Sequence, residues 1–143
     1  MTSFFDTSAL IKKYIHETGS EFVNLYLTQS PSIAVCSTTR VECSSVINRM
    51  LANGEMTAEE SNYLQNQIAE DLQFYEVIPF SETLEKIAID MVKKHRLRTL
   101  DAIQLASALR VSQIQHYFVS DTKLKESGKT EDLSVIDPNE NQL

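Results

Sequence analysis

The chain has 143 residues, 42% of them hydrophobic and 23% charged, which is typical of one globular domain and excludes a disordered or fibrous protein. Its formal net charge of −7 argues against a protein that holds nucleic acid through overall positive charge. It has no apolar stretch near the roughly 18 residues that cross a bilayer, no secretion signal, and no zinc or disulfide pattern at its two cysteines, so we expect a cytoplasmic protein with no membrane partner.

Short apolar runs alternate along the chain with segments whose apolar spacing is near 3.6 residues. The first half contains a strand at residues 3–5 (SFF), helical faces at 9–14 and 22–26 separated by Gly19, a strand at 33–37 (IAVCS), and a helix at 41–50 that stops at Asn53-Gly54. The second half contains a polar helix at 57–73, a strand at 75–80 (YEVIPF), helices at 82–95 and 100–113, and strands at 116–120 (HYFVS) and 133–136 (LSVI).

This alternation predicts βαβ crossovers and therefore an α/β fold. We expect a central, mostly parallel sheet of about five strands with helices on both faces, which is a three-layer α/β/α domain. No repeat or linker divides the chain. We predict a single domain over residues 1–138 and a polar tail over residues 139–143.

Four acids lie where predicted strands lead into helices. Asp6 and Asp121 directly follow strands, Glu42 lies just inside the helix after residues 33–37, and Asp101 lies in the first turn of a helix that begins near Thr99. Ligands of open α/β sheets bind beyond the carboxyl ends of the strands, so we expect these four residues, the rim acids, to converge. Gathered carboxylates repel one another unless a cation neutralises them, and an all-oxygen site suits Mg²⁺ or Mn²⁺.

Each rim acid also has a structural interpretation, which the sequence leaves open. Asp6 could cap a helix that starts at Ser8, and Asp121 could cap the segment after it. Glu42 could complete a capping box over residues 39–42. Asp101 could interact favourably with the dipole of its own helix.

Four segments together resemble the PIN-domain ribonuclease family, and most closely its VapC-type toxins. They are FFDTSALIKKY (4–14), TTRVECSSVINR (38–49), RLRTLDAIQLASAL (96–109) and FVSDTKL followed by LSVIDP (118–138), and they match in order and spacing over nearly the whole chain. The resemblance implies a PIN-like domain that cuts single-stranded RNA with Mg²⁺ or Mn²⁺, leaving 3′-hydroxyl and 5′-phosphate ends.

Carried over position by position, the resemblance implies that the rim acids Asp6, Glu42, Asp101 and Asp121 are the catalytic and metal-binding residues. The chain departs from the family where Ser120 and Asp121 are adjacent, because family members commonly have one residue between them. Asp121 could therefore bind the metal directly, act through water, or leave the position to a neighbour such as Ser120.

Four residues are candidates for substrate binding: Thr7, Ser8, Arg98 and Ser120. Ser8 has an alternative role as a helix N-cap. Arg98 belongs to a segment, residues 93–129, with eight bases and three acids, which could contact the RNA backbone or form the basic end of a helix. Gln104, three residues after Asp101, could also face the site.

The resemblance implies two protein partners, a small antitoxin whose tail enters the acidic groove and a second copy of the chain. For the homodimer, the apolar residues of helices at 41–51 and 57–72 could supply a symmetric interface. The alternative function is a catalytically degenerate PIN-like domain that binds RNA or protein. Phosphoryl-transfer domains fit poorly, because a haloacid-dehalogenase-like enzyme expects a second acid where this chain has Ser8.

Overall fold

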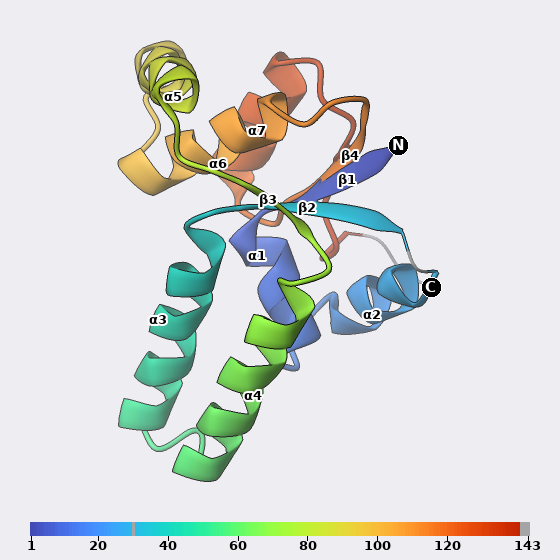
Figure 1. Ribbon diagram of the computed structural model, residues 1–143, viewed down its shortest axis with the longest axis vertical. Helices are drawn as coiled ribbons and strands as arrows, with labels where there is room; N and C mark the ends of the chain where they lie inside the picture. Colours follow the sequence, from blue (N-terminus) through green and yellow to red (C-terminus); the bar gives the residue numbers. More distant parts are fainter. Residues whose placement is uncertain (30, 141–143) are drawn as a thin grey trace.

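The computed structural model describes residues 1–29 and 31–140 and contains a central sheet between two layers of helices (Figure 1). The sheet has five strands in the order β3-β2-β1-β4-β5, and every neighbouring pair is parallel. The strands are β1 (Thr2–Phe5), β2 (Ser32–Cys36), β3 (Glu76–Ile78), β4 (Ile114–Phe118) and β5 (Val135–Ile136). The predicted three-layer α/β fold is confirmed.

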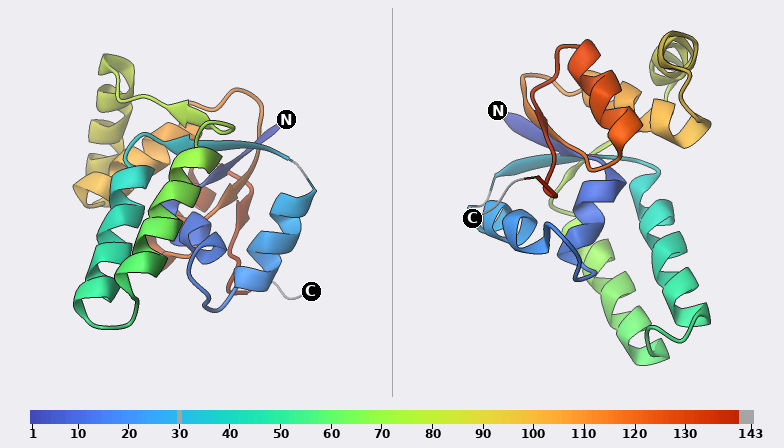
Figure 2. Two further views of the ribbon diagram at one scale, coloured as in Figure 1. Left: turned by 60° about the horizontal axis from the view of Figure 1, so that its bottom comes forward. Right: turned by 180° about the vertical axis from the view of Figure 1, so that it is seen from behind.

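The helices divide between the two faces of the sheet (Figures 1 and 2). One face is covered by α1 (Thr7–Leu10), the 3-10 turn η1 (Ile11–Lys13), α2 (Ser20–Thr28), α3 (Thr39–Ala52) and α4 (Ala58–Asp71). The other face is covered by α5 (Glu82–His95), α6 (Thr99–Leu109) and α7 (Thr122–Thr130). None of the described helices has the length and apolar character of a membrane span.

Alternation along the strands supplies a core to each face. On β1, Phe4 packs with the α5–α7 side, whereas Phe5 packs with α1 and α2. On β4, Tyr117 and Phe118 divide in the same way, so the Phe5 and Phe118 rings stack with their centroids 4.3 Å apart. Helices α3 and α4 form a hairpin that projects away from the sheet (Figures 1 and 2) and packs on η1 through a third apolar cluster that includes Ile47 and Ile68.

Two helices differ from the sequence prediction. The helix expected at residues 100–113 ends at Leu109, because the backbone of Arg110 caps it and Gln113 adopts a left-handed conformation before β4. Helix α7 was not predicted, since its sequence TKLKESGKT is polar and contains Gly128. A Cβ atom at Gly128 would lie 2.9 Å from the ring of Tyr117, so this glycine permits close packing of α7 on β4.

The chain after β5 is held against the domain as far as it is described. Buried Lys125 forms ion pairs with Asp137 at 2.8 Å and with Glu140 at 2.7 Å. The Asn139 amide donates a hydrogen bond to Asp137 at 2.9 Å. Of the predicted polar tail at 139–143, residues 141–143 lie outside the described part of the chain.

Gly19 supports this arrangement, and replacing it with alanine is expected to destabilise the protein. Gly19 has a φ of +92°, and a Cβ atom there would lie 2.9 Å from the carbonyl oxygen of Pro138. Gly54 has a φ of +75° with no atom within 4 Å of an added Cβ, so Gly54→Ala tests the backbone strain alone. Because overpacking costs about 1–3 kcal/mol, we expect Gly19→Ala to lower the free energy of unfolding in urea by that much more than Gly54→Ala. Equal losses would contradict a steric role for Gly19.

Candidate metal centre

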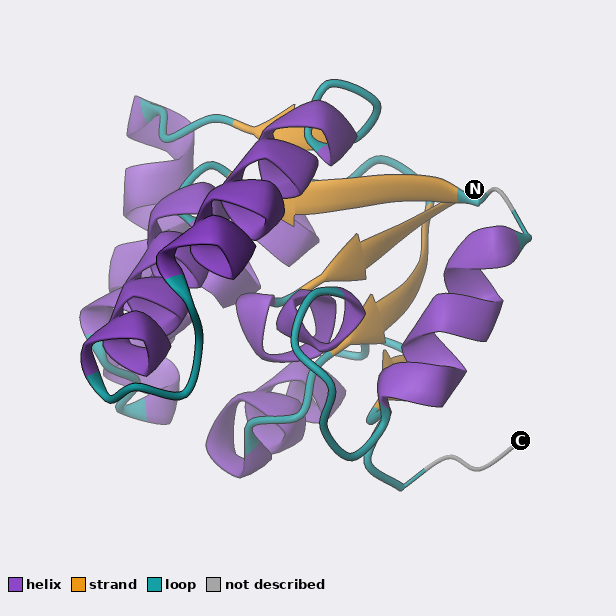
Figure 3. Ribbon diagram, turned by 90° about the horizontal axis from the view of Figure 1, so that it is seen from below, coloured by secondary structure: helices purple, strands orange, loops and turns teal. Residues whose placement is uncertain are grey.

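The strand arrows point toward one edge of the sheet, its carboxyl edge (Figure 3). The rim acids lie in the segments that follow the strands or begin the helices. Asp6 ends β1 and caps α1, and Asp121 follows β4 and caps α7. Glu42 and Asp101 lie in the first turns of α3 and α6. Since β1 pairs with both β2 and β4, the segments that follow these three strands are neighbours in space, and they carry Asp6, Glu42 and Asp121.

The charges of the rim acids act on one another. Burial raises the pKa of Asp6 to about 7, hydrogen bonds from Ser8 oppose the rise, and the charges of Glu42 and Asp101 add to it. Burial also raises the pKa of Asp101, together with the charges of Asp121 and Glu42. The acids therefore form one electrostatically coupled group.

Two basic residues act on this group. The charges of Arg98 and Lys123 oppose the rise in the pKa of Asp101. Arg98 is exposed at the start of α6, and Lys123 donates a hydrogen bond to the Arg96 carbonyl oxygen at 2.6 Å. Positive charge from the start of α6 and from α7 thus acts on the acidic group at Asp101.

Ser8 links Asp6 to the end of β4. Its hydroxyl and its backbone amide both donate to Oδ2 of Asp6, and the hydroxyl accepts a hydrogen bond from the Ser120 amide at 3.0 Å. The Asp6 amide also donates to the carbonyl oxygen of Phe118 at 2.9 Å. Asp6 is therefore both a helix cap and a member of the acidic group.

Glu42 does not form the capping box that the sequence allowed. The N-cap of α3 is Thr38, and no side chain donates or accepts a capping hydrogen bond there. Instead, Oε1 of Glu42 accepts hydrogen bonds from the Thr38 hydroxyl and from Nε2 of Gln104, both at 2.8 Å. Glu42 is thus held by the N-cap side chain of its own helix and by a side chain from α6.

Asp121 is the most exposed of the four acids, and its capping interpretation is confirmed. Its Oδ1 accepts a hydrogen bond from the Leu124 amide at 2.9 Å. Its charge nevertheless reaches Asp101. Nearby, burial raises the pKa of Asp137, but hydrogen bonds from Lys125 and the Asn139 amide, together with the charge of Lys125, bring it below its usual range.

The donor set fits a divalent cation that prefers oxygen ligands. In the hydrogen bonds of the described residues, Asp6, Glu42 and Asp121 each use one carboxylate oxygen, which leaves Oδ1, Oε2 and Oδ2 respectively for a ligand. Within residues 1–29 and 31–140, no three acid, histidine or cysteine side chains stand in position to hold a metal ion. Mutual repulsion keeps uncompensated carboxylates apart, and a cation removes that repulsion.

The remaining predicted residues surround the acids in different ways. Buried Thr7 donates to the Thr39 hydroxyl at 3.2 Å and accepts from Gln104 at 3.0 Å, so its hydroxyl faces the base of the site. Ser8 and Ser120 are partly buried, with the Ser8 hydroxyl engaged as described. Gln104 lies beneath Glu42 and is 1% exposed.

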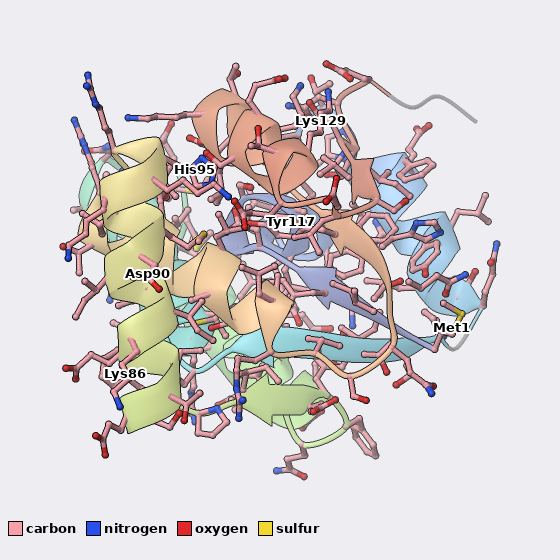
Figure 4. All side chains as sticks on the ribbon, turned by 90° about the horizontal axis from the view of Figure 1, so that it is seen from above. Met1, Lys86, Asp90, His95, Tyr117 and Lys129 are labelled. Atoms are coloured by element: carbon pink, nitrogen blue, oxygen red, sulfur yellow. The ribbon has the colours of Figure 1, made fainter. Side chains whose placement is uncertain are left out.

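Sequence reasoning missed Tyr117, which points into the core on the α6 and α7 side of β4. It lies near the centre of the molecule in Figure 4 and is fully buried. Its hydroxyl has no hydrogen-bond partner among the described residues. Burial raises the pKa of Tyr117 well above its usual value, and the charges of Asp6, Asp101 and Asp121 add to the rise. The period of two in HYFVS could have assigned Tyr117 to this face, but not its hydroxyl to the neighbourhood of the acids.

Comparisons with known proteins agree with this fold. A chain in a toxin–antitoxin complex from Klebsiella pneumoniae matches the fold with 17% identity and a TM-score of 0.67, over 95% of this chain and 97% of that chain. A chain of VapBC2 from Rickettsia felis, bound to a DNA fragment from its promoter, matches with 14% identity and a TM-score of 0.65, over 96% of this chain and 98% of that chain. A chain of FitAcB from Neisseria gonorrhoeae matches with 18% identity and a TM-score of 0.74, over 99% of this chain and 100% of that chain. No curated protein matches the sequence significantly. The model of the PIN domain family matches residues 3–127, and this chain therefore belongs to that family.

Proposed function

We propose that this protein is a cytoplasmic endoribonuclease that cuts single-stranded RNA with Mg²⁺ or Mn²⁺, and that it is the toxin of a toxin–antitoxin pair. The observation that carries the proposal is the coupled group of rim acids at the carboxyl edge of the sheet in a PIN domain. Like charges gathered around the buried carboxyl group of Asp6 destabilise the fold in the absence of a cation, so their presence favours a metal-dependent activity.

A divalent cation held by Asp6, Glu42, Asp101 and Asp121 would lower the pKa of a bound water and neutralise charge on the scissile phosphate. In this proposal Asp6 and Asp101, the two acids whose pKa is raised, hold the cation at the base of the site. Glu42 and Asp121 complete the oxygen ligands from either side. Because each acid except Asp101 is fixed by a hydrogen bond to one oxygen, the protein orients the other oxygen in advance.

Residues around the acids would position the RNA. The positive charges of Arg98 and Lys123 act on Asp101. In this proposal the two side chains bind a phosphate next to the cleaved bond. Thr7, Ser8 and Ser120 surround Asp6 and would orient it and the scissile phosphate. The overall negative charge of the chain restricts RNA attraction to this local basic side.

Cleavage of a labelled single-stranded RNA tests the proposal. We expect wild-type protein to cut in the presence of Mg²⁺ or Mn²⁺ and to stop in the presence of a chelator. Asp101→Asn is expected to lose cleavage, while Asp90→Asn, the same change at an exposed acid on α5 (Figure 4), is expected to retain it. Absence of metal-dependent cutting on a broad set of RNAs would favour the alternative, a degenerate PIN-like domain that binds RNA or protein.

Similar solved structures are toxin–antitoxin complexes, which supports an antitoxin as the partner of this chain. A basic antitoxin segment would complement the acidic rim. The exposed side chains of Val41 on α3 and Tyr63 on α4 support a second partner, another copy of this chain. We expect the antitoxin to stop cleavage at a one-to-one ratio, and sedimentation of the free chain to show a dimer. Full activity in the presence of bound antitoxin, or a stable monomer, would contradict the respective part of the proposal.

A further inference from the structure

Gln104 joins the starts of three helices beneath the rim acids. Its Nε2 lies 2.8 Å from Oε1 of Glu42 on α3, 3.0 Å from the hydroxyl of Thr7 on α1, and 3.3 Å from the hydroxyl of Thr39 on α3. Gln104 itself belongs to α6, one turn after Asp101. Gln104, Thr7 and Thr39 are all buried, so this network is shielded from solvent.

The contact with Glu42 decides which of its oxygens can reach a ligand. Oε1 accepts from Gln104 and from the Thr38 hydroxyl, and these two donors come from different elements. Two donors on one oxygen restrict rotation of the carboxylate group, so Oε2 is held pointing away from Gln104 and Thr38. No described residue donates a hydrogen bond to Oε2.

Packing alone does not account for a glutamine at this position. Oε1 of Gln104 is buried without a hydrogen-bond partner among the described residues, which is unfavourable for the fold. Turning the amide over would place this oxygen against Glu42 and lose the donated hydrogen bonds, so the network also fixes the amide orientation. An apolar side chain of the same length would fill the space without leaving a polar atom unpaired.

We propose that Gln104 is a positioning residue that acts through Glu42, holding the Oε1 atom of that carboxylate so that Oε2 is directed at the divalent cation. This inference rests on the proposed metal centre and extends it to a residue that contacts neither the cation nor the RNA. Residues that orient metal ligands typically change metal affinity about 10-fold to 100-fold when they are replaced.

Calorimetric titration of the purified protein with Mn²⁺ tests the inference without reference to activity. We expect Gln104→Met to weaken Mn²⁺ binding at least about 10-fold while thermal unfolding in the presence of a chelator changes little. Gln104→Asn, which shortens the side chain by one methylene and keeps an amide, provides a second variant with the same expected direction. Ser107→Ala is the matched control, because buried Ser107 lies one turn further along α6 and its hydroxyl, among the described residues, bonds only to the Ile103 carbonyl oxygen.

The same titration in a Glu42→Gln background separates positioning from a general structural effect. If Gln104 acts through Glu42, Gln104→Met should add little to the affinity already lost in that background. An equal further loss there, or wild-type affinity in both Gln104 variants, would overturn the inference and leave the metal centre standing. Absence of Mn²⁺ binding by the wild-type protein would overturn the metal centre and this inference together.

Discussion

Asp6→Asn is expected to abolish metal-dependent cleavage and, at the same time, to stabilise the metal-free protein. The amide retains an oxygen that can accept the hydrogen bonds from Ser8, so the cap of α1 should survive. The amide removes the negative charge that binds a cation. Replacing a residue that only orients a metal ligand lowers activity by up to about 100-fold, so we expect the loss of a ligand itself to lower cleavage by at least that much.

The gain in stability follows from the pKa of Asp6. Burial and the neighbouring acids raise that pKa from 3.8 to about 7 in the folded protein. A raised carboxyl pKa means that folding stability is fully present below about pH 4 and is lost as the pH rises toward 7. Asparagine lacks this loss, so the variant should be more stable at pH 8 by on the order of 4 kcal/mol, and this advantage should vanish near pH 4.

Urea unfolding in a chelator at pH 4 and pH 8, beside the cleavage assay, measures both effects. Asp90→Asn serves as the control, because Asp90 is exposed on α5 and neither effect is expected there. A variant that cuts RNA normally would remove Asp6 from the proposed chemistry. A variant that is less stable at pH 8 than the wild type would show that Asp6 is held mainly as a helix cap.

Phe118→Ala is expected to cause the largest loss of stability of the substitutions considered. Phe118 is fully buried, stacks on Phe5 at 4.3 Å, and lies 4.6 Å from the ring of Tyr26. Removing a buried phenylalanine side chain costs about 3–5 kcal/mol, a large fraction of the about 5–15 kcal/mol that stabilises a typical domain.

The same residue also connects the core to the site, because its carbonyl oxygen accepts the hydrogen bond from the Asp6 amide. Urea unfolding followed by circular dichroism measures the loss. Phe74→Ala provides the matched control, since Phe74 is 85% exposed and a surface change of this kind is expected to stay within about 0.5 kcal/mol. Similar losses in the two variants would contradict the assignment of Phe118 to the core.

The sequence by itself was sufficient to predict the fold. The five strands, the alternation with helices and the stop of α3 at Asn53 are local properties, since periodicity and turn residues are read over a few positions. The position of Asp6 directly after an apolar run, and of Asp101 in a first helical turn, could be predicted for the same reason. Helix α7 was not predicted, because its polar composition and Gly128 disfavour a helix locally. Packing on Tyr117 nevertheless requires that glycine.

Only the tertiary structure decided how the acids are held. Glu42 reads as a capping-box residue in its own segment, but its partners are Thr38 and Gln104, and Gln104 lies 62 residues away in the chain. The contact of Gln104 with Thr7 spans 97 residues. Such contacts depend on the strand order, which places β1 between β2 and β4 and brings α1, α3 and α6 to one edge. The strand order cannot be predicted from local sequence, because it depends on how both apolar faces of the sheet are buried by helices in the complete fold.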